Sequence, residues 1–205
     1  MLGAGVLIII GCLGLGKGTQ TPTKLYVLNS LQSSEDEIPA IAKLPDVSIG
    51  VGPVRIPQYL DRPQIVRRSS QNQLGLVEFA QWAEPLRVNI SRVLAENLSI
   101  LLATKHVSIF PWLRTTKIDY QVIMEITRFD GNPRENALLR AKWSIFGEDG
   151  EAMLVSDYSS YSDPIKTNDP EALVAAQSRA VEHLSREIAR ALHAVAAGKI
   201  PASKE

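Results

Sequence analysis

The single cysteine of this 205-residue chain stands where a thiol could be acylated. Cys12 closes the run Ile9-Ile10-Gly11-Cys12, which has the aliphatic and small residues of a bacterial lipobox. In such a motif a small residue precedes the cleavage site, and the cysteine after it becomes the acylated N-terminus. Two acyl chains anchor a protein stably, whereas one chain binds a bilayer only marginally. The motif therefore predicts that Cys12 is a lipidation site.

The residues before Cys12 have the character of an export signal. No charged side chain occurs before Lys17. The uncharged run of about 15 residues is too short for a bilayer-spanning helix, which needs roughly 20, but it suits the apolar core of a secretory signal. The absence of Lys or Arg ahead of this run departs from the usual pattern. We expect a signal peptide over residues 1–11 and a lipidated N-terminus with its tether over residues 12–23.

The same segment has a competing interpretation as a phosphate-binding loop. Gly11-Cys-Leu-Gly-Leu-Gly-Lys-Gly-Thr19 follows an apolar stretch and resembles the loop of nucleoside monophosphate kinases, in which glycine amides and a lysine hold phosphates. Lys17 and Thr19 would be its functional residues. Such a loop must open a helix, whereas Pro22 stops a helix near its start. A third interpretation is a plain apolar segment with neither role.

Residues for catalysis or metal binding form no convincing group elsewhere. His183 and His193 are ten residues apart, which on a helix is about 15 Å and too far for a shared metal ion. The sequence contains no His-Glu-x-x-His or Gly-x-Ser-x-Gly motif, and nothing singles out a pair of carboxylates. We therefore expect that the protein is not an enzyme and uses no metal or cofactor.

The composition is that of an ordinary globular protein. Apolar residues make up 45% and charged residues 21%, and 22 basic side chains balance 22 acidic ones. A nucleic-acid-binding protein normally carries a basic excess, so we expect no nucleic acid partner. The length suits one domain. We place this domain at residues 24–198, followed by a tail over residues 199–205.

A second group of residues points to recognition rather than catalysis. The segment 55–68 combines four arginines and a tyrosine with two prolines, and a tryptophan and a further proline follow it. Such charges can protect a sheet edge from pairing, or they can form a docking surface for a partner protein or for anionic headgroups. The tryptophan stands at a helix entrance and can equally belong to the core. The candidate docking residues are Arg62, Pro63, Gln64, Arg67, Trp82 and Pro85.

Hydrophobic periodicity predicts the elements that hold these residues. Apolar residues at three- and four-residue spacing predict helices over residues 85–102 and 169–198, and Asp169 is the expected N-cap of the second. Alternation at period two predicts strands between residues 118 and 161. Turns over residues 130–133 and 149–150 would join these strands into an antiparallel meander.

Three short strands are expected before the first helix, over residues 25–28, 47–56 and 63–68. The second contains Gly50, Gly52 and Pro53, which favour a bulged or an edge position. The whole pattern predicts an α/β fold. It is a mixed sheet with an antiparallel meander and two main helices packed on it, in an αβα-type sandwich.

The sequence resembles one known family over nearly its whole length. Leu60-Asp-Arg-Pro-Gln-Ile-Val-Arg67, followed by Leu76-x-x-Phe79-x-x-Trp82-x-Glu84-Pro85-Leu86, is similar to the signature of the PqiC/YmbA-like lipoproteins. These are auxiliary lipoproteins of ABC-type MCE transport systems. Lys24-Leu-Tyr-Val-Leu28 after the lipobox fits the same family, as do the meander and the last helix.

The resemblance implies a non-enzymatic lipoprotein of the Gram-negative outer membrane that faces the periplasm. Leu13 agrees with this location, because Asp after the cysteine is the usual signal for inner-membrane retention. The implied partners are a periplasmic MCE-domain protein and an inner-membrane permease and ATPase. With them the lipoprotein would serve lipid transport between membranes and envelope integrity, by docking the MCE component. A homo-oligomer is compatible with the resemblance.

Two alternatives to the docking function remain open at the level of the sequence. One is a kinase-like phosphate-loop protein that uses Lys17 and Thr19. The other is a periplasmic protein that itself carries lipid.

Overall fold

The computed structural model describes residues 21–31, 40–44, 46–132, 135–148 and 150–199. Cys12, Lys17 and Thr19 lie outside the described residues, as do the expected signal peptide and most of the tether and tail. The fold therefore leaves the lipidation and phosphate-loop predictions untested.

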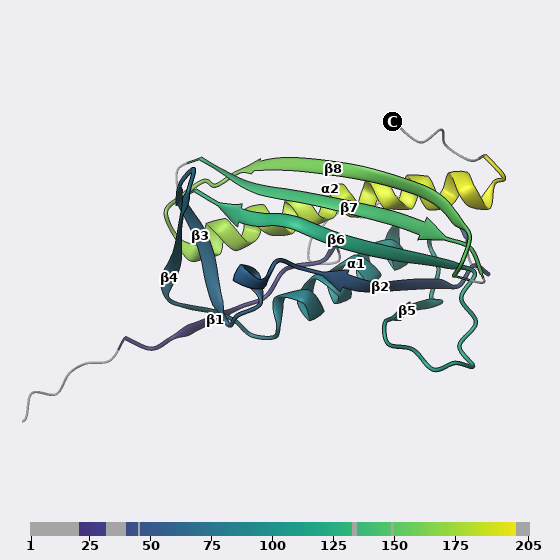
Figure 1. The fold of residues 1–205 in the computed structure, drawn as a ribbon, viewed down its shortest axis with the longest axis horizontal. Helices are drawn as coiled ribbons and strands as arrows, with labels where there is room; N and C mark the ends of the chain where they lie inside the picture. The colour runs from purple at the N-terminus through teal and green to yellow at the C-terminus, as the bar shows by residue number, and fades with distance from the viewer. Residues whose placement is uncertain (1–20, 32–39, 45, 133–134, 149, 200–205) are drawn as a thin grey trace, which may run out of the picture.

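A five-stranded mixed sheet forms the main layer of the fold (Figure 1). Its strands are β2 (Ile49–Arg55), β5 (Val107–Ile109), β6 (Tyr120–Gly131), β7 (Asn136–Phe146) and β8 (Met153–Pro164). Their order across the sheet is β5-β2-β6-β7-β8. The strand β2 runs parallel to both of its neighbours, and β6, β7 and β8 pair antiparallel. The predicted meander is confirmed.

Two helices, α1 (Leu86–Leu101) and α2 (Pro170–Ala196), lie side by side on one face of this sheet (Figure 1). The carboxylate of Asp169 accepts a hydrogen bond of 2.8 Å from the Glu171 N–H and so caps α2 as predicted. Gly198, just beyond α2, has a φ of 71°, which a glycine adopts at little cost. The predicted α/β sandwich, a mixed sheet with two main helices packed on it, is confirmed.

A smaller three-stranded sheet stands at one end of the large sheet (Figure 1). It consists of β1 (Lys24–Tyr26), β3 (Gln64–Ser70) and β4 (Gln73–Trp82) in the order β1-β4-β3. The strands β3 and β4 form an antiparallel hairpin, and β1 runs parallel to the last residues of β4. This hairpin packs against β6 and so brings the arginine-rich segment over the large sheet.

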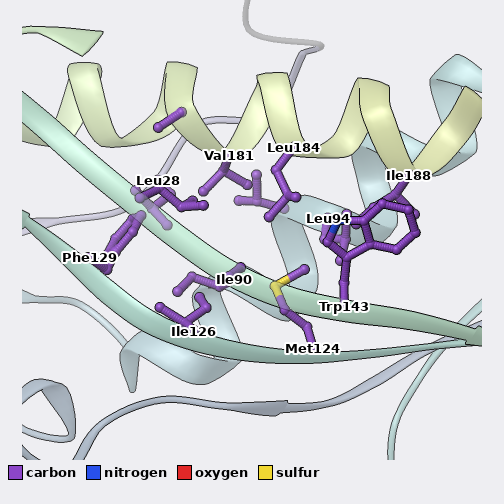
Figure 2. Close-up of a cluster of buried hydrophobic side chains, with 14 of the residues drawn as sticks. Leu28, Ile90, Leu94, Met124, Ile126, Phe129, Trp143, Val181, Leu184 and Ile188 are labelled. Atoms are coloured by element: carbon purple, nitrogen blue, oxygen red, sulfur yellow. The ribbon is translucent and has the colours of Figure 1, made fainter. Parts of the chain in front are cut away.

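The core fills the space between the helices and the large sheet. Figure 2 shows Leu94 and Ile90 of α1 and Leu184 and Ile188 of α2 directed toward Met124 and its neighbours on the sheet. Residues at the predicted spacing on both helices are buried, which confirms the helical stripes. This burial of apolar surface is the main favourable contribution to folding.

Two buried asparagines of α1 fix the chain that follows β1. The Asn89 side-chain oxygen accepts a hydrogen bond of 3.0 Å from the Leu28 N–H, and that of Asn97 accepts one of 2.9 Å from the Leu31 N–H. Both asparagine side chains are fully buried. The N-terminal part of the domain is therefore held by polar contacts that an apolar pattern does not reveal.

The sequence favours a bulged or an edge position for the strand over residues 47–56, and the structure shows the bulge but not the edge. Its pairing with β6 has the expected bulge, between Val51 and Val54, but β2 is an inner strand because the short β5 covers its other edge. Gly50 is required there, since a Cβ atom would lie 2.8 Å from the ring of Trp112. The glycines of β2 therefore reflect close packing rather than an exposed edge.

Candidate partner-docking site

Four of the six candidate docking residues line one surface pocket of about 260 Å³. Pro63, Trp82 and Pro85 supply its apolar surface, and Arg62 stands at its rim. The remaining lining residues are Asp61, Ala83 and Glu84. The structure thus brings together residues that are about twenty positions apart in the sequence.

The small sheet sets the geometry of this pocket. The Trp82 N–H donates a hydrogen bond of 2.7 Å to the Pro63 carbonyl oxygen, which joins the end of β4 to the start of β3. Immediately afterwards the Ala83 N–H donates to the Tyr26 carbonyl oxygen at 2.9 Å. Pro85 then occupies the N-cap position of α1, where its missing N–H leaves no donor unsatisfied. Both walls of the pocket are therefore fixed by backbone contacts.

Trp82 belongs largely to the core, because its side chain is only 5% exposed. Within the part of the chain that the structure describes, its indole N–H donates no hydrogen bond, so the ring offers the pocket an apolar surface. The two interpretations of this tryptophan are therefore compatible: most of the ring packs inside, and one edge faces the pocket.

Some of the charged side chains around the pocket form ion pairs, and one does not. Arg87 of α1 pairs with Asp61 at 3.1 Å, and Arg92 pairs with Glu84 at 2.9 Å. Burial works against the charge of Arg92, but its hydrogen bonds to Glu84 and Glu96 outweigh burial and raise its pKa. Among the described residues, Arg62 has no carboxylate partner. It is the cation of the rim that remains available to a partner.

Gln64 and Arg67 are not part of this pocket. Gln64 is half-buried on β3 opposite Gln81 of β4. Arg67 lies further along β3 and lines a separate cavity of about 20 Å³ with Val77 and the start of α2. Its buried Nε has no hydrogen-bond partner in the described structure, and a cavity of that size can hold one water molecule.

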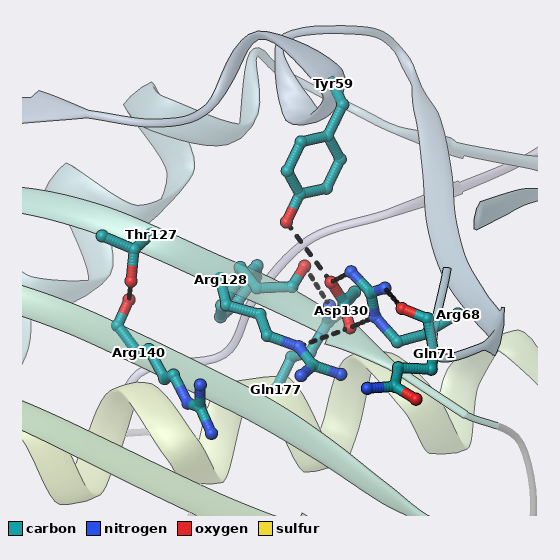
Figure 3. A network of polar contacts seen from close by, with 9 residues as sticks. Tyr59, Arg68, Gln71, Thr127, Arg128, Asp130, Arg140 and Gln177 are labelled. Atoms are coloured by element: carbon teal, nitrogen blue, oxygen red, sulfur yellow. Dashed lines mark hydrogen bonds and ion pairs between the residues drawn. The ribbon is translucent and has the colours of Figure 1, made fainter. Parts of the chain in front are cut away.

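A buried ion-pair network was not anticipated from the sequence (Figure 3). The carboxylate of Asp130 on β6 is completely buried. Arg68 of β3 donates to both of its oxygens, each at 2.9 Å. Arg128 donates to Oδ1 at 3.1 Å, and the Tyr59 hydroxyl to Oδ2 at 3.3 Å. The network ties the small sheet to the large one.

The ionisation of this network follows from its geometry. Burial disfavours the charged form of Asp130, but the hydrogen bonds from Arg68 and Arg128 outweigh this effect and lower its pKa. Burial and the adjacent carboxylate raise the pKa of Tyr59. Asp130 is therefore an anion and Tyr59 a neutral donor at neutral pH.

The two histidines that the sequence offers as metal ligands, His183 and His193, occupy ordinary positions along α2. The ring of His183 stacks on Tyr161 with centroids 5.5 Å apart, and its Nε2 lies 3.6 Å from Asp163. His193 stands in the last turn of α2. In the described ranges no three His, Cys, Asp or Glu side chains gather as metal ligands. None of the helices described is both long and apolar enough to cross a membrane.

Comparison with known proteins identifies the kind of domain. The family model for the ABC-type transport auxiliary lipoprotein component matches residues 26–189. A search of curated proteins gave no match.

Two crystal structures are among those that resemble the fold. One is a Xanthomonas campestris protein of the family DUF330, with a TM-score of 0.67 and 16% identity, covering 81% of this chain and 92% of that chain. The other is an uncharacterized protein with a TM-score of 0.67 and 17% identity, covering 84% of this chain and 99% of that chain. At this level of identity the likeness concerns the fold.

Proposed function

The chain belongs to the family of ABC-type transport auxiliary lipoprotein components, and from this premise we propose that it is the outer-membrane subunit of an MCE-type system that moves lipid between membranes. In this role it is not an enzyme. It docks the periplasmic MCE-domain protein, which works with an inner-membrane permease and ATPase. The kinase-like alternative is not favoured, because the matched family is one of transport lipoproteins.

The pocket around Trp82 supports the docking role. It combines an apolar floor of two prolines and a tryptophan edge with one unpaired cation, Arg62. Interfaces favour this combination, because aromatic and arginine side chains carry much of the binding free energy. The surrounding carboxylates are already paired with α1, so a partner would meet a preformed site. This convergence of four motif residues is the observation that carries the proposal.

A lipid anchor at Cys12 gives the domain its place beside the membrane. Lys24, the first residue of β1, is twelve positions after Cys12. A chain of that length spans at most about 40 Å when extended. The tether therefore keeps the folded domain close to the bilayer while leaving it free to reach a periplasmic partner.

A binding experiment with a charge-reversal variant tests the docking role. Tagged mature lipoprotein in mild detergent would be used to capture the MCE-domain protein of the same bacterium. We expect Arg62→Glu to weaken capture about tenfold, as loss of an interfacial arginine commonly does. Arg114→Glu is the matched control, because Arg114 is also exposed and, among the described residues, unpaired, but lies outside the pocket.

Equal capture by Arg62→Glu and the wild-type protein would contradict the docking assignment. An equal loss in both variants would also contradict it, since the effect would then come from net charge rather than from the pocket.

A further inference from the structure

A second and larger pocket lies between the β3–β4 turn and the face of the large sheet that the helices leave open. Its volume is about 530 Å³. Its lining includes Arg68 and Ser70 of the hairpin, Arg128 of β6, Glu135 just before β7, Asn136 at the start of β7, and Ser162 of β8. It shares no residue with the Trp82 pocket, so the two pockets are separate sites.

The guanidinium groups of the two arginines at this pocket differ in how many of their nitrogens have a hydrogen-bond acceptor. Arg68 uses Nε and Nη2 on Asp130, and its Nη1 donates to the Gln71 carbonyl oxygen at 2.9 Å. Arg128 uses only its Nε, on Asp130. Its two terminal nitrogens have no acceptor in the described part of the chain. Because Asp130 supplies one negative charge to two guanidinium groups, one positive charge remains.

A third arginine increases this excess of charge. Arg140 of β7 stands directly opposite Arg128 in the sheet register, and Figure 3 shows both on the same open face of the sheet. The side chain of Arg140 is exposed and, among the described residues, has no ion pair. Like charges directly opposite one another destabilise a sheet. An anion held between the two would remove that repulsion.

The carboxylates near the pocket do not cancel the excess. Asp130 is fully engaged in the network, and Glu135 at the rim is exposed and, in the ranges described, unpaired. The three positive charges of Arg68, Arg128 and Arg140 are therefore balanced by only two carboxylates, and one positive charge remains. The planar guanidinium group also matches phosphate oxygens in geometry.

We propose that this pocket binds a phosphate-bearing anion through Arg128, with the Ser162 hydroxyl and the Asn136 amide as further donors. Arg140, the neighbour of Arg128 across the sheet, adds its positive charge from beside the pocket. Asp130 acts as a positioning residue, because it fixes the Nε of Arg128 and leaves the terminal nitrogens directed away from the ion pair. The volume lies within the range of small-molecule sites and exceeds what a bare phosphate fills. The ligand chemistry is shared by free phosphate and by the phosphate of a lipid headgroup.

Calorimetric titration of the full-length protein in nonionic detergent at low ionic strength tests this inference. The two probes are inorganic phosphate and glycerol 3-phosphate, a soluble headgroup fragment. We expect Arg140→Gln to weaken binding about tenfold, through loss of the positive charge next to Arg128. Glu135→Gln should tighten binding. Neither side chain has a hydrogen bond or an ion pair in the described structure, and both are exposed, so both variants should fold normally.

Lys142→Gln is the matched control for Arg140→Gln. Lys142 is exposed on the same strand, two residues further from the pocket, and its loss should leave binding unchanged. Tighter binding of glycerol 3-phosphate would assign the site to a headgroup, and binding of inorganic phosphate alone would assign it to the free ion. Absence of binding by both probes, or an equal loss in Lys142→Gln and Arg140→Gln, would overturn the proposal.

Discussion

Replacing Asp130 by Asn would measure how strongly the buried ion pair holds the two sheets together. The carboxylate is fully buried, whereas the side chains of Arg68 and Arg128 are 20% and 30% exposed. Removing one partner of a buried pair typically costs about 3–5 kcal/mol. Because both cations keep access to water, we expect the lower end, about 3 kcal/mol, in the free energy of unfolding at pH 7.

The effect of Asp130→Asn should depend on pH with a definite sign. The native pKa of Asp130 lies below its ordinary value, because the arginine hydrogen bonds outweigh the penalty of burial. A carboxyl group of this kind stabilises the fold above its unfolded pKa of about 3.9. That stabilisation is lost as the pH falls through the native pKa. The difference between the wild-type protein and Asp130→Asn should therefore shrink below about pH 4.

Urea unfolding followed by circular dichroism at pH 7 and pH 3 would provide both numbers. Asp61→Asn is the matched control, because Asp61 forms an exposed pair with Arg87, and such pairs contribute about 0.5 kcal/mol. A loss in Asp130→Asn no larger than in this control would refute the reasoning. So would a difference that stays constant between the two pH values.

Three further substitutions have expected effects on the free energy of unfolding, each measured by the same urea titration. Gly50→Ala should cost about 1–3 kcal/mol, because its Cβ atom would meet the Trp112 ring at 2.8 Å; a neutral effect would mean that the ring moves freely. Trp82→Ala should cost about 3–5 kcal/mol, since the side chain is 5% exposed, and a loss below 1 kcal/mol would show that the ring is not part of the core. Asp169→Ala should cost about 1 kcal/mol through loss of the α2 cap, whereas Asp169→Asn should keep most of the cap.

Local patterns in the sequence predict the helices and the meander well. The apolar stripe of α2 and its cap at Asp169 depend on neighbours within a few residues, and both are confirmed. The alternation along β7 likewise places Trp143 toward the helices and Lys142 away from them. Such features need no knowledge of distant contacts.

Features that depend on distant packing are not predictable in this way. Asp130 reads as the first residue of a turn, yet it lies inside β6 and is buried because the β3–β4 hairpin covers it. The register of that hairpin is irregular between Gln64 and Val66, and Phe79 in β4 has a φ of 52°. Side chains along β4 therefore do not alternate strictly between the two faces of the sheet. The sequence gives no sign of this irregularity.

The positions of the candidate docking residues also depend on distant packing rather than on local sequence. Arg62 and Pro63 meet Trp82 because the ends of β3 and β4 are paired. Arg67 has the same residue type as Arg62 and lies close to it in sequence, but it occupies a different cavity. Arginine content alone could not separate these two roles, since it is the pairing of the strands that places each side chain.

The mass of the N-terminal peptide of the mature protein tests the central claim most directly. Membrane fractions of cells that produce the chain would be digested and analysed by mass spectrometry. We expect a peptide that begins at Cys12 and carries acyl groups, recovered with the outer membrane. A peptide that still begins with an unmodified Met1, in protein released from the membrane, would contradict the proposal of a lipid-anchored docking subunit.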